Sequence, residues 1–239
     1  MLPPGKFTVW GILGAVSIGV TVFGVFILQE FSSFFHISEE LAQAPPDSAL
    51  YEFVNIAEEQ AIQQSAMLTS AVWGATVAGM YGVGQGLLEG RSKQIAIRCL
   101  GGILGGGMLA VFMPVTGDWL ARVFIGEGID SRMPNSSQDF QILMRTGIEQ
   151  FSLIFAISLA VFFTVNMPIH DQRRLRKQLI SALMVSLLAV SFFHAVSAIA
   201  LPLAPFDDPL PDSSIQRWFF SSIVAVLLGF SLIRERCRE

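Results

Sequence analysis

The chain has 239 residues, of which 52% are hydrophobic and only 14% are charged. Soluble domains carry about 25% charged residues, and a chain of this length has too little polar surface to cover several long apolar helices in water. The composition therefore excludes an ordinary soluble domain, and the net charge of −4 gives no indication of nucleic-acid binding.

Six apolar segments each have roughly the 20 residues that a helix needs to cross the hydrocarbon core of a bilayer. They are residues 7–28, 66–88, 95–115, 148–167, 179–203 and 215–233. The sequence therefore predicts an all-α, polytopic integral membrane protein with six transmembrane helices in one membrane domain, 1–239.

Lys and Arg are distributed unevenly between the two sides that these spans define. Eleven of the fifteen fall on the side that holds both termini and the loops 89–98 and 168–178, whereas fifteen of the nineteen acids fall on the other side. Because cytoplasmic loops retain Lys and Arg, this pattern predicts that both termini are cytoplasmic. We assign the chain to a bacterial inner (plasma) membrane. The basic run 173–177 is interpreted as a topology signal, with a specific lipid or partner site as the alternative.

The first two spans are joined by an acidic segment. The first span is an uncharged run longer than the apolar core of a cleavable signal peptide, which favours a retained signal anchor. Residues 29–65 contain seven acids and no Lys or Arg, and Pro45-Pro46 interrupts them. From Leu50 onward apolar residues recur at helical spacing, so we predict an acidic external helical hairpin whose second arm continues into the second span. It is interpreted as a partner-facing or spacer element.

Small residues recur at every fourth position on the second and third spans. The second span carries Ser70, Gly74, Ala78, Gly82 and Gly86, and the third carries Gly102, Gly106 and Ala110. Glycine in a helix interior costs about 1 kcal/mol relative to alanine, and in membranes close helix–helix approach offsets that cost. The spacing predicts a glycine-packed helix hairpin from spans two and three. The alternative is that these glycines line a conduction path or a bend.

The second large external loop, 116–147, opens with a segment around Trp119 that combines an aromatic residue, aliphatic residues and one Arg. This composition predicts a short interfacial helix. The last external loop, 202–212, holds four prolines and is expected to be extended.

Few ionisable residues lie within the spans. Arg145 and Glu149 are four residues apart near the outer end of the fourth span, which favours an intrahelical ion pair. His194 lies about two turns inside the fifth span and is interpreted first as a neutral side chain bonded to a neighbouring helix. The sharper hypothesis is that Glu149 and His194 meet and form a proton or ion site.

Residue patterns for catalysis or metal binding are not found. No Gly-x-Ser-x-Gly sequence occurs, the three histidines are scattered, and neither Cys99 nor Cys237 has a neighbour at metal-ligating spacing. We therefore expect no catalytic residues, no metal and no cofactor, and classify the chain as not an enzyme.

The functional expectation is a non-enzymatic membrane component or scaffold that binds other proteins. Its predicted partners are the lipid bilayer and other membrane proteins or a second copy of itself, with no nucleic acid. The alternative is a small-solute or ion transporter or channel with Glu149 and His194 near the path. Three spans followed by three of opposite orientation would suit an inverted repeat, but the two halves show no matching sequence.

Overall fold

The computed structural model describes residues 5–37, 50–90, 92–125, 135–166, 172–200, 210–211 and 213–237. Every regular element within these ranges is a helix. The helices are α1 (Lys6–Phe31), α3 (Leu50–Glu89), α4 (Ser92–Val111), α5 (Met113–Ile125), α6 (Asn135–Val165), α7 (Gln172–Ala200) and α8 (Ser214–Arg236). Six helical stretches are long and apolar enough to span a membrane, with α4 and α5 together forming one of them. The protein is therefore all-helical with six candidate spans, as the apolar segments predict.

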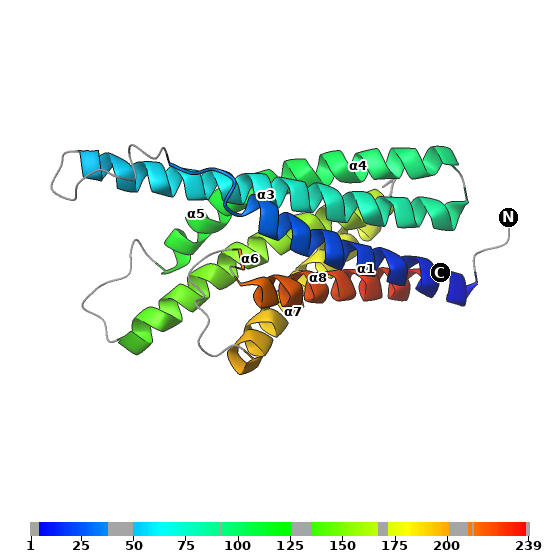
Figure 1. Ribbon diagram of the computed structural model, residues 1–239. Coiled ribbons are helices and arrows are strands. Elements are labelled where there is room, and N and C mark those ends of the chain that lie inside the picture. Colours follow the sequence, from blue (N-terminus) through cyan, green and yellow to red (C-terminus); the bar gives the residue numbers. More distant parts are fainter. Residues whose placement is uncertain are drawn as a thin grey trace.

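The helices form one elongated bundle in which the two chain termini lie at the same end (Figure 1). α1 packs against α3 and α8, while α6 contacts α3, α4, α5 and α7. Most of the α6 span is buried inside the protein, whereas only a small part of the combined α4–α5 span is buried. The core of the bundle is thus built around α6, and α4, α5 and α7 present large apolar surfaces outward.

α3 and α4 lie antiparallel and very close together. A Cβ atom added at Gly74 would lie 2.6 Å from the carbonyl oxygen of Gly106. A Cβ at Gly82 would collide with the carbonyl oxygen of Arg98, and one at Gly86 would lie 2.5 Å from the Cα of Ile95. The two backbones are therefore in direct contact along these glycines. Any side chain larger than a hydrogen atom at these positions would force the helices apart.

Aromatic and hydroxyl side chains connect α3 with α1, α7 and α8. The ring of Trp73 lies 5.3 Å from that of Phe220 on α8, and Phe220 lies 5.1 Å from Phe193 on α7. The buried hydroxyl of Tyr81 donates to the carbonyl oxygen of Ala225 at 2.7 Å and lies 3.0 Å from the hydroxyl of Ser17 on α1. These contacts tie α1, α3, α7 and α8 into one core.

α3 runs without a break from Leu50 to Glu89, so the helical spacing that begins at Leu50 continues directly into the second span, as expected. Two other helices differ from the expected spans. α6 begins at Asn135, thirteen residues before the expected start of the fourth span. The expected third span, 95–115, divides at Phe112, and the helix around Trp119 begins earlier than expected, at Met113. Pro114 explains the division, because proline lacks an amide hydrogen and fits only the first turn of a helix.

The connection from α1 to α3 is described only at its two ends. After α1, the backbone amide of Phe35 donates to the hydroxyl of Ser65 on α3 at 2.9 Å. The chain that leaves α1 therefore lies against the middle of α3. The expected break at Pro45-Pro46 lies outside the described residues, as do residues 126–134 of the external loop 116–147 and residues 202–209 of the loop predicted at 202–212.

Candidate functional site

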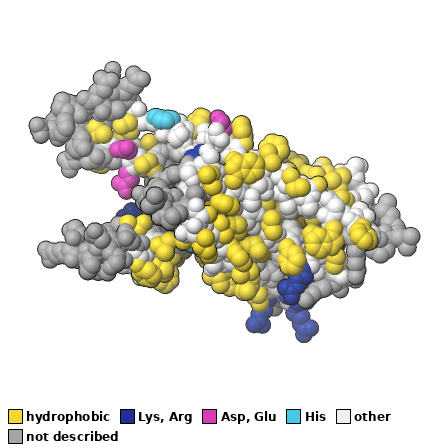
Figure 2. All heavy atoms as spheres, turned by 60° about the horizontal axis from the view of Figure 1, so that its bottom comes forward, with side chains coloured by type: hydrophobic (Ala, Val, Ile, Leu, Met, Phe, Trp, Pro, Cys, Tyr) yellow, Lys and Arg dark blue, Asp and Glu magenta, His cyan; other side chains and the backbone are white. Residues whose placement is uncertain are grey.

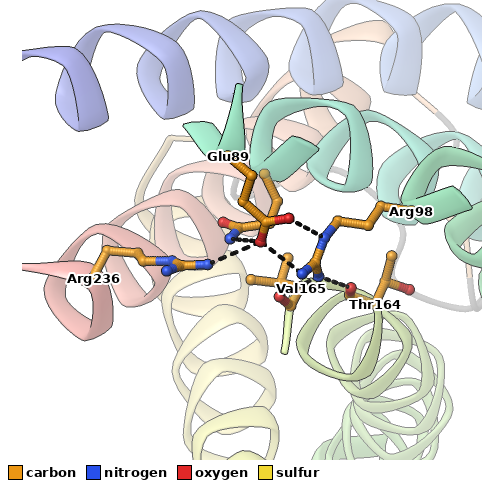
Figure 3. A network of polar contacts seen from close by, with 6 residues as sticks. Glu89, Arg98, Thr164, Val165 and Arg236 are labelled. Atoms are coloured by element: carbon orange, nitrogen blue, oxygen red, sulfur yellow. Dashed lines mark hydrogen bonds and ion pairs between the residues drawn. The ribbon is translucent and has the colours of Figure 1, made fainter. Parts of the chain in front are cut away.

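A network of charged side chains joins four helices at the end of the bundle that holds the termini (Figure 3). Arg98 on α4 binds Glu89, the last residue of α3, through two hydrogen bonds: Nη2 to Oε1 at 2.6 Å and Nε to Oε2 at 3.1 Å. Gln85 donates to the same carboxylate at 3.0 Å, and Arg236 of α8 lies 3.7 Å from it. The Glu89 carboxylate is thus the centre at which α3, α4 and α8 meet.

Arg98 also binds the end of α6. Its Nη1 donates to the carbonyl oxygens of Thr164 and Val165 at 2.7 and 2.5 Å. The last carbonyls of a helix lack partners within the helix and carry its negative dipole end, so a guanidinium is a favourable partner for them. Arg98 is only 9% exposed. Its contacts with a carboxylate and two carbonyls compensate for the burial of its charge. The arrangement fixes the helix ends and is well suited to stabilise the bundle.

Sequence reasoning treated Glu89 and Arg98 only as loop charges and missed this network. Arg98 lies within the apolar segment 95–115. An Arg inside a span requires an acidic or carbonyl partner, so the position of Arg98 alone could have indicated a polar contact there. The partner itself could not be derived, because it depends on how α3, α4 and α6 pack.

A second chain of charges lies at the opposite end, between α5 and α6. Arg145 on α6 donates from Nε to Oε1 of Glu149 at 3.2 Å, the pair that the four-residue spacing predicts. The same guanidinium binds Asp118 on α5 at 2.5 Å, and Asp118 also accepts from Arg122 at 2.8 Å. Asp118 and Arg122 were not among the predicted site residues, although their own spacing indicates an ion pair. The chain of four charges therefore connects α5 to α6.

Glu149 is the most buried member of this chain, with 7% of the residue exposed. A Cβ added at Gly117 of α5 would lie 2.9 Å from the Cα of Glu149, so Gly117 allows α5 to lie directly over the carboxylate-bearing turn of α6. Glu149 is therefore enclosed between α5 and α6, beside the Arg145 guanidinium.

His194 packs against a different part of α6. Its Nε2 lies 3.7 Å from the point where a Cβ of Gly147 would be, and its ring contacts that of Phe193 edge-on at 5.6 Å. Successive residues of an α-helix are separated by about 100°, so positions 147 and 149 point roughly 200° apart. His194 therefore packs against one face of α6, and the contacts of Glu149 with Arg145 and α5 lie on another face.

The described part of the chain holds no group of three His, Cys, Asp or Glu side chains that could bind a metal ion. Several polar side-chain atoms in the bundle, including the hydroxyls of Ser70, Ser197 and Ser221 and the Oε1 of Gln150, are enclosed by protein. Comparisons of the chain with known families, known proteins and solved structures give no match.

Proposed function

We propose that the protein is a non-enzymatic, multi-pass component of a bacterial inner membrane that binds other proteins through the parts of its helices outside the lipid. The partners would be other membrane-associated proteins or a second copy of the chain. The observation that carries the proposal is the projection of α3 beyond the length of a membrane span.

α3 is too long to lie within a bilayer. Its 40 residues correspond to a length of about 60 Å, twice the roughly 30 Å of the hydrocarbon core. Glu58 and Glu59 are exposed on its first half, and ionised side chains do not face lipid tails. The part of α3 before Ser65 therefore belongs in water, while the apolar part after Ser65 crosses the lipid.

This projecting arm of α3, residues 50–64, exposes large apolar side chains. Phe53, Ile56 and Ile62 are 62%, 50% and 55% exposed, and they lie beside exposed acids and glutamines. Apolar patches that remain exposed to water and are bordered by polar residues are typical of protein–protein contact sites. The arm thus has the surface of a docking element.

The distribution of charge indicates how the protein is oriented in the membrane. The contacts of Glu89, Arg98 and Arg236 bring the ends of α3, α4, α6 and α8 together at the end where the termini lie. On the face drawn in Figure 2, the acidic side chains lie toward the end where α3 begins, and the largest group of Lys and Arg lies toward the other half. The positive-inside tendency supports cytoplasmic termini and an external α3 arm.

The glycine faces of α3 and α4 are proposed to be packing surfaces rather than a conduction path. The direct backbone contacts at Gly74, Gly82 and Gly86 support this, because a path would require space between the two helices.

An affinity capture experiment tests the docking role of the arm. The tagged protein is purified from membranes as wild type and with Phe53→Ala, Ile56→Ala and Ile62→Ala combined, and captured proteins are quantified by mass spectrometry. A matched control carries three alanines in place of Leu100, Leu104 and Met108, which are exposed on α4. We expect specific partners to be lost with the arm variant and retained with the control. Equal capture by all three proteins would refute the proposal.

The burial of Glu149 favours one second candidate, a small-solute or ion transporter with Glu149 and His194 near its path. A nearly buried carboxylate within a span is a common feature of ion pathways. In proteoliposomes, this candidate predicts a proton or cation flux that Glu149→Gln and His194→Ala each abolish without reducing the amount of folded protein. Absence of flux in the wild type excludes it.

A further inference from the structure

The first turns of α7 carry four cations on the outside of the bundle. Arg173, Arg174, Arg176 and Lys177 are all exposed, and no acidic residue lies in the first turn of the helix. Among the residues that the structure describes, Arg174, Arg176 and Lys177 form no ion pair. Lys and Arg side chains project together from a largely hydrophobic surface in Figure 2.

This concentration of charge is unfavourable for α7 on its own. The N-terminal end of a helix carries a partial positive charge, which repels cations placed in its first turn. Neighbouring cations on successive turns also repel each other. A bound anion would relieve both effects, so the charge of the cluster is complementary to an anionic ligand.

The apolar residues that follow on the same face show what kind of anion fits. Arg176 and Lys177 lie one turn before Ile180, and Leu183 and Leu187 continue the same stripe at helical spacing. These three apolar residues are 50%, 47% and 53% exposed, in that order. The core-facing stripe of α7, which includes Ala182, Ala189 and Phe193, lies on another side of the helix. The cations therefore stand at the end of a surface that faces lipid tails.

We propose that this surface of α7 binds an anionic phospholipid. The phosphate of the headgroup would lie on the Arg176 and Lys177 side chains, with Arg173 beside them, and an acyl chain would lie along Ile180, Leu183 and Leu187. One helical turn rises about 5.4 Å, which places the cations just beyond the acyl region at the depth of the lipid phosphates. Both parts of the lipid thus contact one continuous helix face.

The test measures lipid binding to the purified full-length protein in dodecyl maltoside by native mass spectrometry. The probes are dioleoylphosphatidylglycerol and dioleoylphosphatidylcholine, which share chains and phosphate but differ in net charge. The variant is Arg176→Gln with Lys177→Gln. The matched control is Lys93→Gln with Arg234→Gln, which removes two exposed cations from the ends of two other helices. A third variant, Arg176→Lys with Lys177→Arg, keeps the charges.

We expect the wild type to bind phosphatidylglycerol more tightly than phosphatidylcholine. Loss of two cations should weaken phosphatidylglycerol binding about thirtyfold, equivalent to about 2 kcal/mol. The control and the charge-keeping variant should bind as the wild type does. Equal weakening in the control would show a general effect of surface charge and overturn the proposal, as would equal binding of the two lipids by the wild type. Full competition by chain-free glycerophosphoglycerol would also overturn it, because the site would then recognise a free anion.

Discussion

Replacing Gly106 with alanine should separate α3 from α4. The added Cβ would collide with the carbonyl oxygen of Gly74 and lie 2.8 Å from the Cβ of Ala78. Carbon atoms in ordinary contact are about 3.5–4.0 Å apart, so the helices would have to move apart by roughly 1 Å. Overpacking of this kind costs about 1–3 kcal/mol, and the higher helix propensity of alanine returns up to about 1 kcal/mol. We expect a net loss of up to about 2 kcal/mol relative to the wild type, and of about 1–3 kcal/mol relative to an alanine that meets no neighbouring atom.

The neighbouring glycine provides the control. A Cβ at Gly105 meets no atom within 4 Å, so Gly105→Ala changes helix propensity without changing the contact. Both variants are unfolded reversibly in mixed micelles of sodium dodecyl sulfate and a nonionic detergent, with helicity followed by circular dichroism. Gly105→Ala should be as stable as the wild type or slightly more stable. If the two variants have the same free energy of unfolding, close packing at Gly106 does not stabilise the hairpin.

Three further predictions concern single polar groups and use the same unfolding measurement. Arg98→Gln should destabilise the protein by about 2–3 kcal/mol, which is less than the cost of breaking a fully buried ion pair because Glu89 is partly exposed. Lys93→Gln removes an exposed cation and should change stability little. Equal effects of the two substitutions would contradict a stabilising role of the network. Tyr81→Phe removes the hydroxyl that contacts Ser17 and Ala225 and should cost about 1 kcal/mol, and an unchanged unfolding midpoint would show that this hydroxyl contributes no net stability. Ser213→Ala removes the capping box at the start of α8 and should cost about 1 kcal/mol, with Ser214→Ala, inside the helix, as the near-neutral control.

The positions of the spans could be derived from the sequence because lipid imposes a simple requirement on a helix. A run of about 20 apolar residues meets it, and six such runs correspond to the six candidate spans. Helix ends were less predictable. α6 begins thirteen residues before its apolar run, since a helix does not have to end where the lipid ends. The start of α3 at Leu50, in contrast, follows from the helical spacing that begins there. The start of α5 depends on Pro114, a local signal that the apolar pattern conceals.

The polar networks could be derived only where both partners lie on one helix. The Arg145–Glu149 pair follows from its four-residue spacing, and the Asp118–Arg122 pair follows the same rule. The contacts of Arg98 with Glu89 and with the carbonyls of α6 depend on the packing of three helices, which no spacing within one helix encodes. The proposed meeting of Glu149 and His194 stays a hypothesis for the same reason.

Labelling of single cysteines in intact cells tests the membrane arrangement most directly. In a background with Cys99→Ala and Cys237→Ala, a membrane-impermeant thiol reagent is applied to variants with cysteine at Lys93, Arg174 or Glu58. All three positions are exposed in the structure. We expect Glu58→Cys to be labelled from outside, and Lys93→Cys and Arg174→Cys to be labelled only after the membrane is permeabilised. Labelling of Lys93→Cys and Arg174→Cys from opposite sides would contradict this arrangement.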